Sequence, residues 1–154
     1  TKNMLDISTL KQSFDCILCF GNTIVHLESL DHIRRLISMI YQQLNQGGCF
    51  LFQIINYDRI YALKDFCLPT IKGTNASLER RYKPKKEKII FKTTLRTANN
   101  TTHNEVELIP LRLNDIEKLL KEAGFDSYSI YENFRTKPFL VFESVRVVVK
   151  AMKR

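Results

Sequence analysis

The sequence of 154 residues lacks several features, and each absence excludes a class of protein. No apolar run comes near the roughly 18 residues that cross a bilayer, and the polar start Thr1-Lys2-Asn3 has no apolar signal segment. There is no Gly-x-Gly-x-x-Gly sequence, the turn that commonly holds nucleotide phosphates. We therefore expect a soluble cytoplasmic protein with no membrane partner, and no phosphate-binding turn of that kind within this chain.

Cysteine is also sparse, with thiols at positions 16, 19, 49 and 67. Cys16 and Cys19 have the spacing of some metal-binding and redox pairs. In an extended strand, however, residues three apart point to opposite faces of the sheet. No second pair supplies further ligands. We therefore expect free thiols in a reducing compartment and no metal site.

The chain does contain 44% hydrophobic residues, enough for one core and a single domain over 1–154. An apolar run over 14–20, a helical period over 29–45 and a second apolar run over 49–55 predict a strand, a helix and a strand. Continuous apolar runs are typical of strands covered on both faces. The two strands should therefore lie parallel in a sheet flanked by helices.

The rest of the chain predicts a helix over 114–123 and a final antiparallel pair of strands over 127–132 and 142–150, joined by the short loop 133–138. Before them, residues 79–109 are charged and alternate between polar and apolar side chains. This pattern favours an inserted β-hairpin with one solvent-exposed face. We expect this insertion to cover part of a substrate site. The whole pattern predicts an α/β fold.

Polar residues follow both parallel strands, at the end where ligands bind in open α/β sheets. Gly21, Asn22 and His26 follow the first strand, and Asn56-Tyr57-Asp58 follows the second. Each candidate has a structural alternative: Asn22 can form a turn with its own backbone, Tyr57 can pack a helix, and His26 can be an ordinary structural histidine.

The order of these features resembles the C-terminal half of class I S-adenosylmethionine-dependent methyltransferases, and among them glycine N-methyltransferase and its relatives. The similar segments keep the order and the intervals of that family. They are Asn3-Met4, Gly21-Asn22-Thr23 with His26-Leu27, Gly47-Gly48, Asn56-Tyr57-Asp58, and the helix and strands over 114–150. The resemblance implies a Rossmann-like methyltransferase fold with parallel core strands, an antiparallel final pair and the inserted hairpin.

The resemblance also implies S-adenosylmethionine as the cofactor and a set of residues that bind it. Asn3 and Met4 would meet the adenine ring. Phe20 and Gly21 would pass beside the cofactor, and His26 would lie near its sulfonium end. The family's first half, with its Gly-rich turn and acidic ribose-binding residue, is not in this sequence. We therefore expect a fragment that binds the cofactor poorly by itself.

The implied catalytic residues are Asn22, His26 and Tyr57, with Asn22 and Tyr57 facing a small-molecule acceptor. Methyl transfer from a sulfonium depends on alignment and desolvation more than on acids or bases, so an amide, an imidazole and a phenol suffice. Ile55 stands where glycine N-methyltransferase has an Arg that pairs with the substrate carboxylate. Glycine is therefore not indicated as the acceptor.

Two alternative functions stay open. The net charge is +8, and residues 80–88 contain six basic side chains and Tyr82, a composition suited to an RNA backbone. Such a run is more commonly a solvated face that protects a sheet edge, and RNA as the acceptor is the alternative. The other alternative is a non-catalytic interaction module whose exposed strand edge recruits a partner chain, including a second copy in a homodimer.

Overall fold

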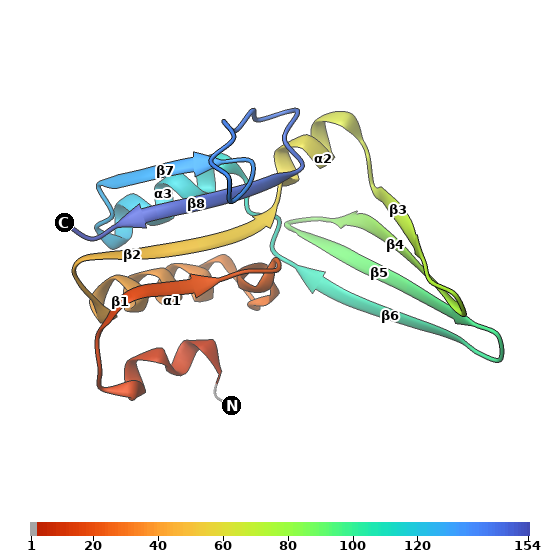
Figure 1. Ribbon diagram of the computed structural model, residues 1–154, viewed down its shortest axis with the longest axis horizontal. Helices are drawn as coiled ribbons and strands as arrows, with labels where there is room; N and C mark the ends of the chain where they lie inside the picture. Colours follow the sequence, from red (N-terminus) through yellow and green to blue (C-terminus); the bar gives the residue numbers. More distant parts are fainter. Residues whose placement is uncertain (1–2) are drawn as a thin grey trace.

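The computed structural model describes residues 3–154, which form two four-stranded sheets. Figure 1 shows the two sheets side by side, with the second extending away from the first. In chain order the elements are η1 (Met4–Leu10), β1 (Phe14–Cys19), η2 (Thr23–His26), α1 (Leu30–Gln43), β2 (Leu44–Ile55), α2 (Tyr57–Leu63), β3 (Cys67–Lys72), β4 (Ala76–Lys85), β5 (Lys88–Thr97), β6 (Thr101–Leu108), α3 (Leu113–Ala123), β7 (Ser127–Tyr131) and β8 (Arg146–Met152).

The first sheet has the strand order β1-β2-β8-β7. β1 and β2 are parallel, while β8 pairs antiparallel with both β2 and β7. These pairings confirm the predicted strand-helix-strand unit and the antiparallel final pair. The predicted start of the last strand at Phe142 is wrong, because β8 begins at Arg146. Residues 132–145 form a loop, in which the Asn56 side chain binds the carbonyls of Val141 and Ser144 at 2.7 Å each.

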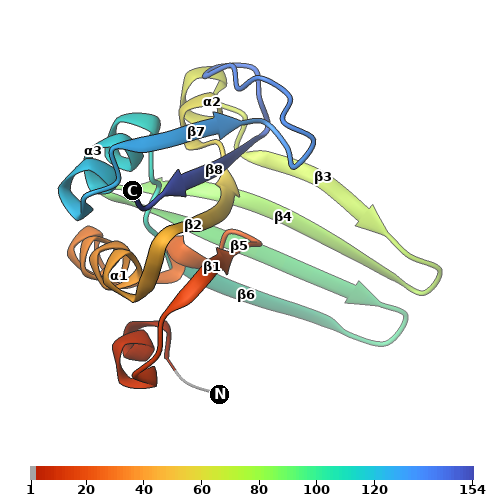
Figure 2. The same ribbon diagram turned by 60° about the vertical axis from the view of Figure 1, so that its left-hand side comes forward.

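Both long helices, α1 and α3, lie on one face of the first sheet (Figure 2). Their buried side chains pack with those of alternate β2 residues, among them Phe50, Phe52 and Ile54. Each helix places apolar residues three and four apart on one side, which is why a single face is buried. α1 ends at Gln43, close to the predicted end at 45, but the predicted strand start at Cys49 is wrong: β2 begins at Leu44, because Leu44 already pairs with Phe14 of β1.

The opposite face of the first sheet is open at β1 within residues 3–154, although Val148 of β8 is buried on that face. β1 is an edge strand of the sheet, and the Leu18 side chain is 57% exposed. The prediction that this strand is covered on both faces is therefore wrong for the described chain. Its apolar run is nevertheless real, because Ile17 and Cys19 pack against the core on the helix side while Leu18 faces outward.

The second sheet is antiparallel with the order β3-β4-β5-β6. The segment 79–109 is thus more than a hairpin: it contains three strands, and β3 adds a fourth. The prediction missed the turn between β4 and β5 because Lys86, at φ 49°, takes the left-handed conformation there in place of the usual Gly or Asn. The second sheet joins the first beside η2, where the Ile109 N–H donates to the Val25 carbonyl at 2.9 Å.

Candidate functional site

A cavity of about 400 Å³ lies beside the carboxyl half of β1, between η1 and α1. Its walls are mainly apolar, and its polar residues are Asn3, Asp6 and Thr23. Three residues expected at the cofactor, Asn3, Met4 and Phe20, line this cavity together. A space of this size with a few polar groups on an apolar wall is typical of small-molecule sites.

The η1 turn places its residues on this wall. The Asn3 side-chain oxygen accepts a hydrogen bond from the Leu5 N–H at 3.0 Å and so caps the turn. Met4, Leu5 and Ile7 then pack against the buried core that includes α1. The cap fixes the start of η1, and Met4, Asp6 and Ile7 of this turn line the cavity.

A sharp turn follows β1 and carries Phe20, Gly21 and Asn22. Gly21 and Asn22 have φ angles of 73° and 66°, a left-handed conformation that Gly and Asn adopt most readily. The Gly21 N–H donates to the Gln53 side-chain oxygen at 3.1 Å, and the Asn22 N–H donates to the Gln53 carbonyl at 3.2 Å. The turn is therefore fastened to β2 through one residue, while Phe20 stays on the cavity wall.

Asn22 and Tyr57 contact each other, as expected for residues that follow neighbouring parallel strands. The Asn22 side-chain nitrogen donates to the Tyr57 hydroxyl at 3.0 Å, and its oxygen accepts from the Ile55 N–H at 3.1 Å. Asn22 is half-buried and Tyr57 is fully buried. The amide thus links the carboxyl ends of β1 and β2 to the start of α2.

Burial also sets the chemistry of the Tyr57 phenol. Burial, together with the neighbouring Tyr82, raises the pKa of Tyr57 far above its ordinary value, and the hydrogen bond from Asn22 offsets this only in part. The phenol is therefore neutral at physiological pH. In this geometry its oxygen accepts a hydrogen bond from the Asn22 amide.

The structure places the remaining candidates outside the cavity lining. His26 is exposed at the end of η2, and Gly21 adjoins the lining without being part of it. Asp58 serves the fold, because its carboxylate accepts a hydrogen bond from the Leu113 N–H at 2.8 Å, at the start of α3. Asn56 caps α2 through a bond from the Arg59 N–H at 3.3 Å.

One aromatic residue near the cavity was missed by sequence reasoning. The Phe134 ring, from the loop 132–145, meets the Phe20 ring edge-on with centroids 4.9 Å apart. Phe134 is 57% exposed, so the Phe20–Phe134 ring contact lies at the protein surface. The only sequence signal was an aromatic residue within a polar loop, and a local pattern of that kind does not say which strand the loop reaches.

The described part of the chain has neither a cluster of metal ligands nor a membrane-spanning helix. No three His, Cys, Asp or Glu side chains of residues 3–154 come together as a metal site. None of the helices in that range is long and apolar enough to cross a bilayer.

Comparisons with known proteins bear on this arrangement. No protein-family model matches the chain. It is 24% identical over 128 residues to the glycine/sarcosine N-methyltransferase of Aphanothece halophytica, a match that covers 82% of this chain and 47% of that protein. The chain therefore spans about half the length of this curated relative.

Solved structures show the same fold. An S-adenosylmethionine-dependent methyltransferase from Clostridium acetobutylicum superposes with a TM-score of 0.74 at 18% identity, over 96% of this chain and 62% of that one. An amino pentose methyltransferase from Micromonospora echinaspora, solved with S-adenosylmethionine bound, gives 0.66 at 13% identity, over 97% and 63%. These comparisons confirm the Rossmann-like methyltransferase fold and the resemblance to S-adenosylmethionine-dependent methyltransferases.

Proposed function

We propose that this chain is the C-terminal portion of an S-adenosylmethionine-dependent methyltransferase that acts on a small molecule. The observation that carries the proposal is the cavity beside β1, which gathers Asn3, Met4 and Phe20 within a methyltransferase fold. The cavity fits the cofactor chemically. Its apolar wall suits a flat adenine ring, and Asn3 and Asp6 can bond the polar edge of that ring.

The proposed roles at the carboxyl end of β1 follow from exposure and contacts. S-adenosylmethionine, when bound, supplies a methyl group on a positively charged sulfur, so the protein has to align the acceptor and exclude water. Phe20 and Gly21 lie beside the cofactor, and the exposed His26 imidazole lies near the sulfonium group of the cofactor. Asn22 orients the acceptor, while the buried Tyr57 is a positioning residue that holds the Asn22 amide in place.

The chain supplies only part of a cofactor site of this kind. Its sequence contains no Gly-x-Gly-x-x-Gly turn that would let the backbone approach the nucleoside closely, and β1 leaves one edge of the first sheet unpaired within residues 3–154. The matches cover 47% of the curated relative and 62% of the first solved structure. We therefore assign the remaining cofactor contacts to polypeptide that is not part of this sequence.

The second sheet is proposed as a side cover of the acceptor site. It contacts the start of α2, just after the carboxyl end of β2, where the Tyr57 and Tyr82 rings meet edge-on with centroids 6.1 Å apart. Several of its basic residues are already paired, because Lys85 and Lys88 both contact the Glu107 carboxylate and Lys92 contacts Glu105. This pairing reduces the charge available to an RNA backbone and favours a small-molecule acceptor.

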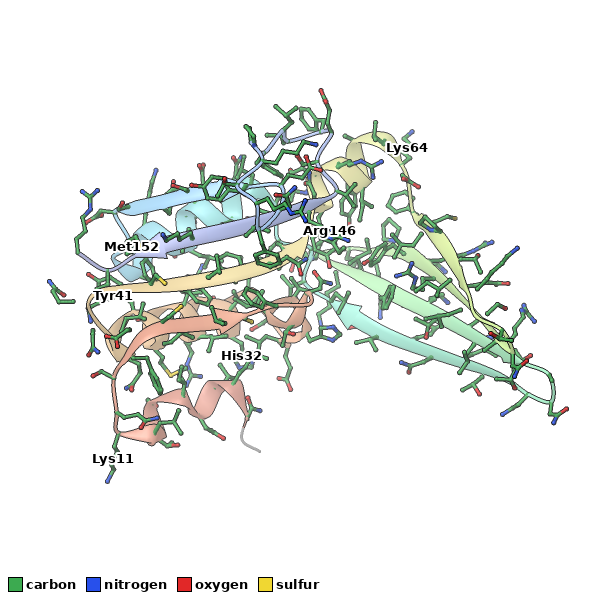
Figure 3. All side chains as sticks on the ribbon, viewed as in Figure 1. Lys11, His32, Tyr41, Lys64, Arg146 and Met152 are labelled. Atoms are coloured by element: carbon green, nitrogen blue, oxygen red, sulfur yellow. The ribbon has the colours of Figure 1, made fainter. Side chains whose placement is uncertain are left out.

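Ile55 narrows the acceptor class. The Ile55 side chain is half-buried at the carboxyl end of β2, and an apolar side chain cannot pair with a carboxylate. Its neighbour across the β2–β8 pairing is Arg146, at the start of β8 (Figure 3). The hydrogen bond from Lys137 is the main cause that lowers the pKa of Glu132, and the Arg146 charge adds a smaller contribution, so Arg146 faces a carboxylate of the loop 132–145. We therefore favour an amine acceptor without a carboxylate, such as an amino sugar, over glycine or sarcosine.

A methyl-transfer assay tests this function. The chain, extended at its N-terminus by the coding sequence upstream of Thr1, is given methyl-labelled S-adenosylmethionine with glycine, sarcosine or an amino sugar. We expect label in the amino sugar and little in glycine. Ile55→Arg should raise kcat/KM for glycine about 10-fold or more, the value of one charged bidentate contact.

The Arg146→Gln variant is the matched control. If Arg146 had taken over carboxylate binding, glycine would be a good substrate of the unchanged protein and a poor one of this variant. Label in none of the acceptors, from a protein that binds the cofactor, would contradict the small-molecule proposal.

A further inference from the structure

Two cysteine thiols lie next to each other on the open face of the first sheet. The Cys16 and Cys49 sulfur atoms are 3.1 Å apart, and both thiols are free. The two residues are direct partners in the β1–β2 pairing. Cys16 is exposed and Cys49 is half-buried. Cys19, only three residues from Cys16, packs toward the core on the other face, as expected for an extended strand.

The spacing of paired strands is compatible with a disulfide between facing cysteines. Paired strands lie about 4.8 Å apart, and a disulfide joins Cα atoms about 4.4 to 6.8 Å apart. The strands approach closely at this point, because a Cβ on Gly48 would lie 3.1 Å from the Phe14 carbonyl oxygen and 3.2 Å from that of Asp15. Closing the bond therefore needs rotation of two side chains and little movement of the chain.

We propose that Cys16 and Cys49 form a vicinal dithiol that a small-molecule disulfide, such as oxidised glutathione, converts to a disulfide within the chain. The Cys16 thiolate attacks the glutathione disulfide, which forms a mixed disulfide and releases one glutathione thiolate. The Cys49 thiol then loses its proton and attacks the Cys16 sulfur, releasing the second glutathione. Two protein thiols are oxidised, one glutathione disulfide is reduced to two thiols, and no other reactant is needed.

The surroundings of the pair make this step slow without an oxidant in excess. Burial and the adjacent Cys49 thiol raise the pKa of Cys16 to about 11, and the Lys150 ammonium acts in the opposite direction. Little thiolate is therefore present at neutral pH, and the dithiol stays reduced under mild conditions. Lys150 lies one strand further, on β8, and Met152 is the β8 partner of Cys49 (Figure 3).

The disulfide would fasten the edge strand to its neighbour. β1 is the strand whose carboxyl end carries Phe20, Gly21 and Asn22, so a link to β2 restrains the strand that leads to the candidate site. The modification does not depend on the proposed methyltransferase function. It rests on the pairing register and on the 3.1 Å distance between the two sulfur atoms.

The test treats the unchanged 154-residue protein with excess oxidised glutathione and counts thiols before and after. We expect the four free thiols to fall to two, with a mass lower by two hydrogen atoms and full recovery on adding dithiothreitol. Peptide mapping without reduction should recover one linked pair, Cys16 with Cys49. Cys67→Ser, at the other exposed cysteine, should give the same loss of two thiols.

Two single variants complete the test. Cys16→Ser and Cys49→Ser each leave one member of the pair, so they should gain a glutathione adduct or stay unchanged and never lose two hydrogen atoms. The proposal is overturned if the unchanged protein keeps four thiols under conditions that oxidise a reference dithiol. It is also overturned if the mapped link joins other cysteines or forms only between two chains.

Discussion

The two sheets of this protein are stabilised in different ways. The first is covered on one face by α1 and α3 and buries large side chains along β2 and β8. In the second, each of β4, β5 and β6 has one buried residue, Tyr82, Ile89 and Leu108 respectively, and these lie at the end next to the first sheet. Beyond that end the second sheet depends on backbone pairing and on surface ion pairs.

The first sheet therefore contributes most to the stability of the chain, while the second contributes mainly exposed surface. The first sheet has the larger hydrophobic driving force and holds the turn Phe20-Gly21-Asn22 in a fixed geometry. The second sheet has little apolar area to lose, so its outer part can vary in sequence without unfolding the core. We therefore expect substitutions in the first sheet to change folding and substitutions in the second to change mainly surface properties.

The largest effect is expected from Phe50→Ala. The Phe50 ring is fully buried and stacks on Phe52 with centroids 4.9 Å apart. Its loss should lower the free energy of unfolding by about 3–5 kcal/mol, measured by equilibrium urea denaturation. Leu95→Ala, at a 41% exposed position of β5, is the control and should cost less than about 1 kcal/mol. Equal losses in the free energy of unfolding for Phe50→Ala and Leu95→Ala would contradict the proposed difference between the two sheets.

An intermediate effect is expected at the carboxyl end of the first sheet. Asn22→Gly keeps the left-handed backbone but leaves the Ile55 N–H and the buried Tyr57 hydroxyl without this amide, at a cost of about 1–3 kcal/mol. Tyr57→Phe should cost less, because it removes the hydroxyl and keeps the packed ring. A double-mutant cycle measures the coupling, which we expect to be about 0.5–1.5 kcal/mol. Strict additivity would show that the contact does not hold Asn22.

The smallest effect is expected from Glu107→Gln in the second sheet. Hydrogen bonds from Lys85 and Lys88 lower the pKa of this exposed carboxylate below its ordinary value of 4.5. A lowered pKa stabilises the fold above the ordinary value, and this contribution is lost as the pH falls through the folded-state pKa. Thermal melts should therefore show a small deficit of the variant at pH 7 that shrinks in acid and in high salt. A deficit that persists in acid would point to packing instead.

The sequence was a good guide where one physical rule decided the outcome. The apolar runs predicted β1 and β2, and the three-and-four spacing predicted α1 and α3 within a few residues. The polar residues after the two strands were predicted to lie at the carboxyl end of the sheet, and the structure adds that Asn22 contacts Tyr57 there. The carboxyl ends of parallel strands lie at the same edge, so strand order alone brings these side chains together.

Other features depend on contacts that the local sequence does not encode. Leu18 belongs to an apolar run, yet no neighbour within residues 3–154 covers it. Phe142 and its neighbours look like a strand, but Asn56 binds the loop carbonyls there and holds them out of the sheet. The meeting of Phe134 with Phe20, and of Cys16 with Cys49, follows from the fold and has no signature in the spacing.

Calorimetric titration with S-adenosylhomocysteine tests most directly the claim that the cavity beside β1 is a cofactor site. We predict saturable binding by the chain extended upstream of Thr1, at least about 10-fold weaker binding by its Met4→Ala variant, and unchanged binding by the Leu95→Ala control. The 154-residue chain alone should bind far more weakly than the extended protein. No binding by the extended protein, or equal binding by the Met4 variant, would contradict the assignment.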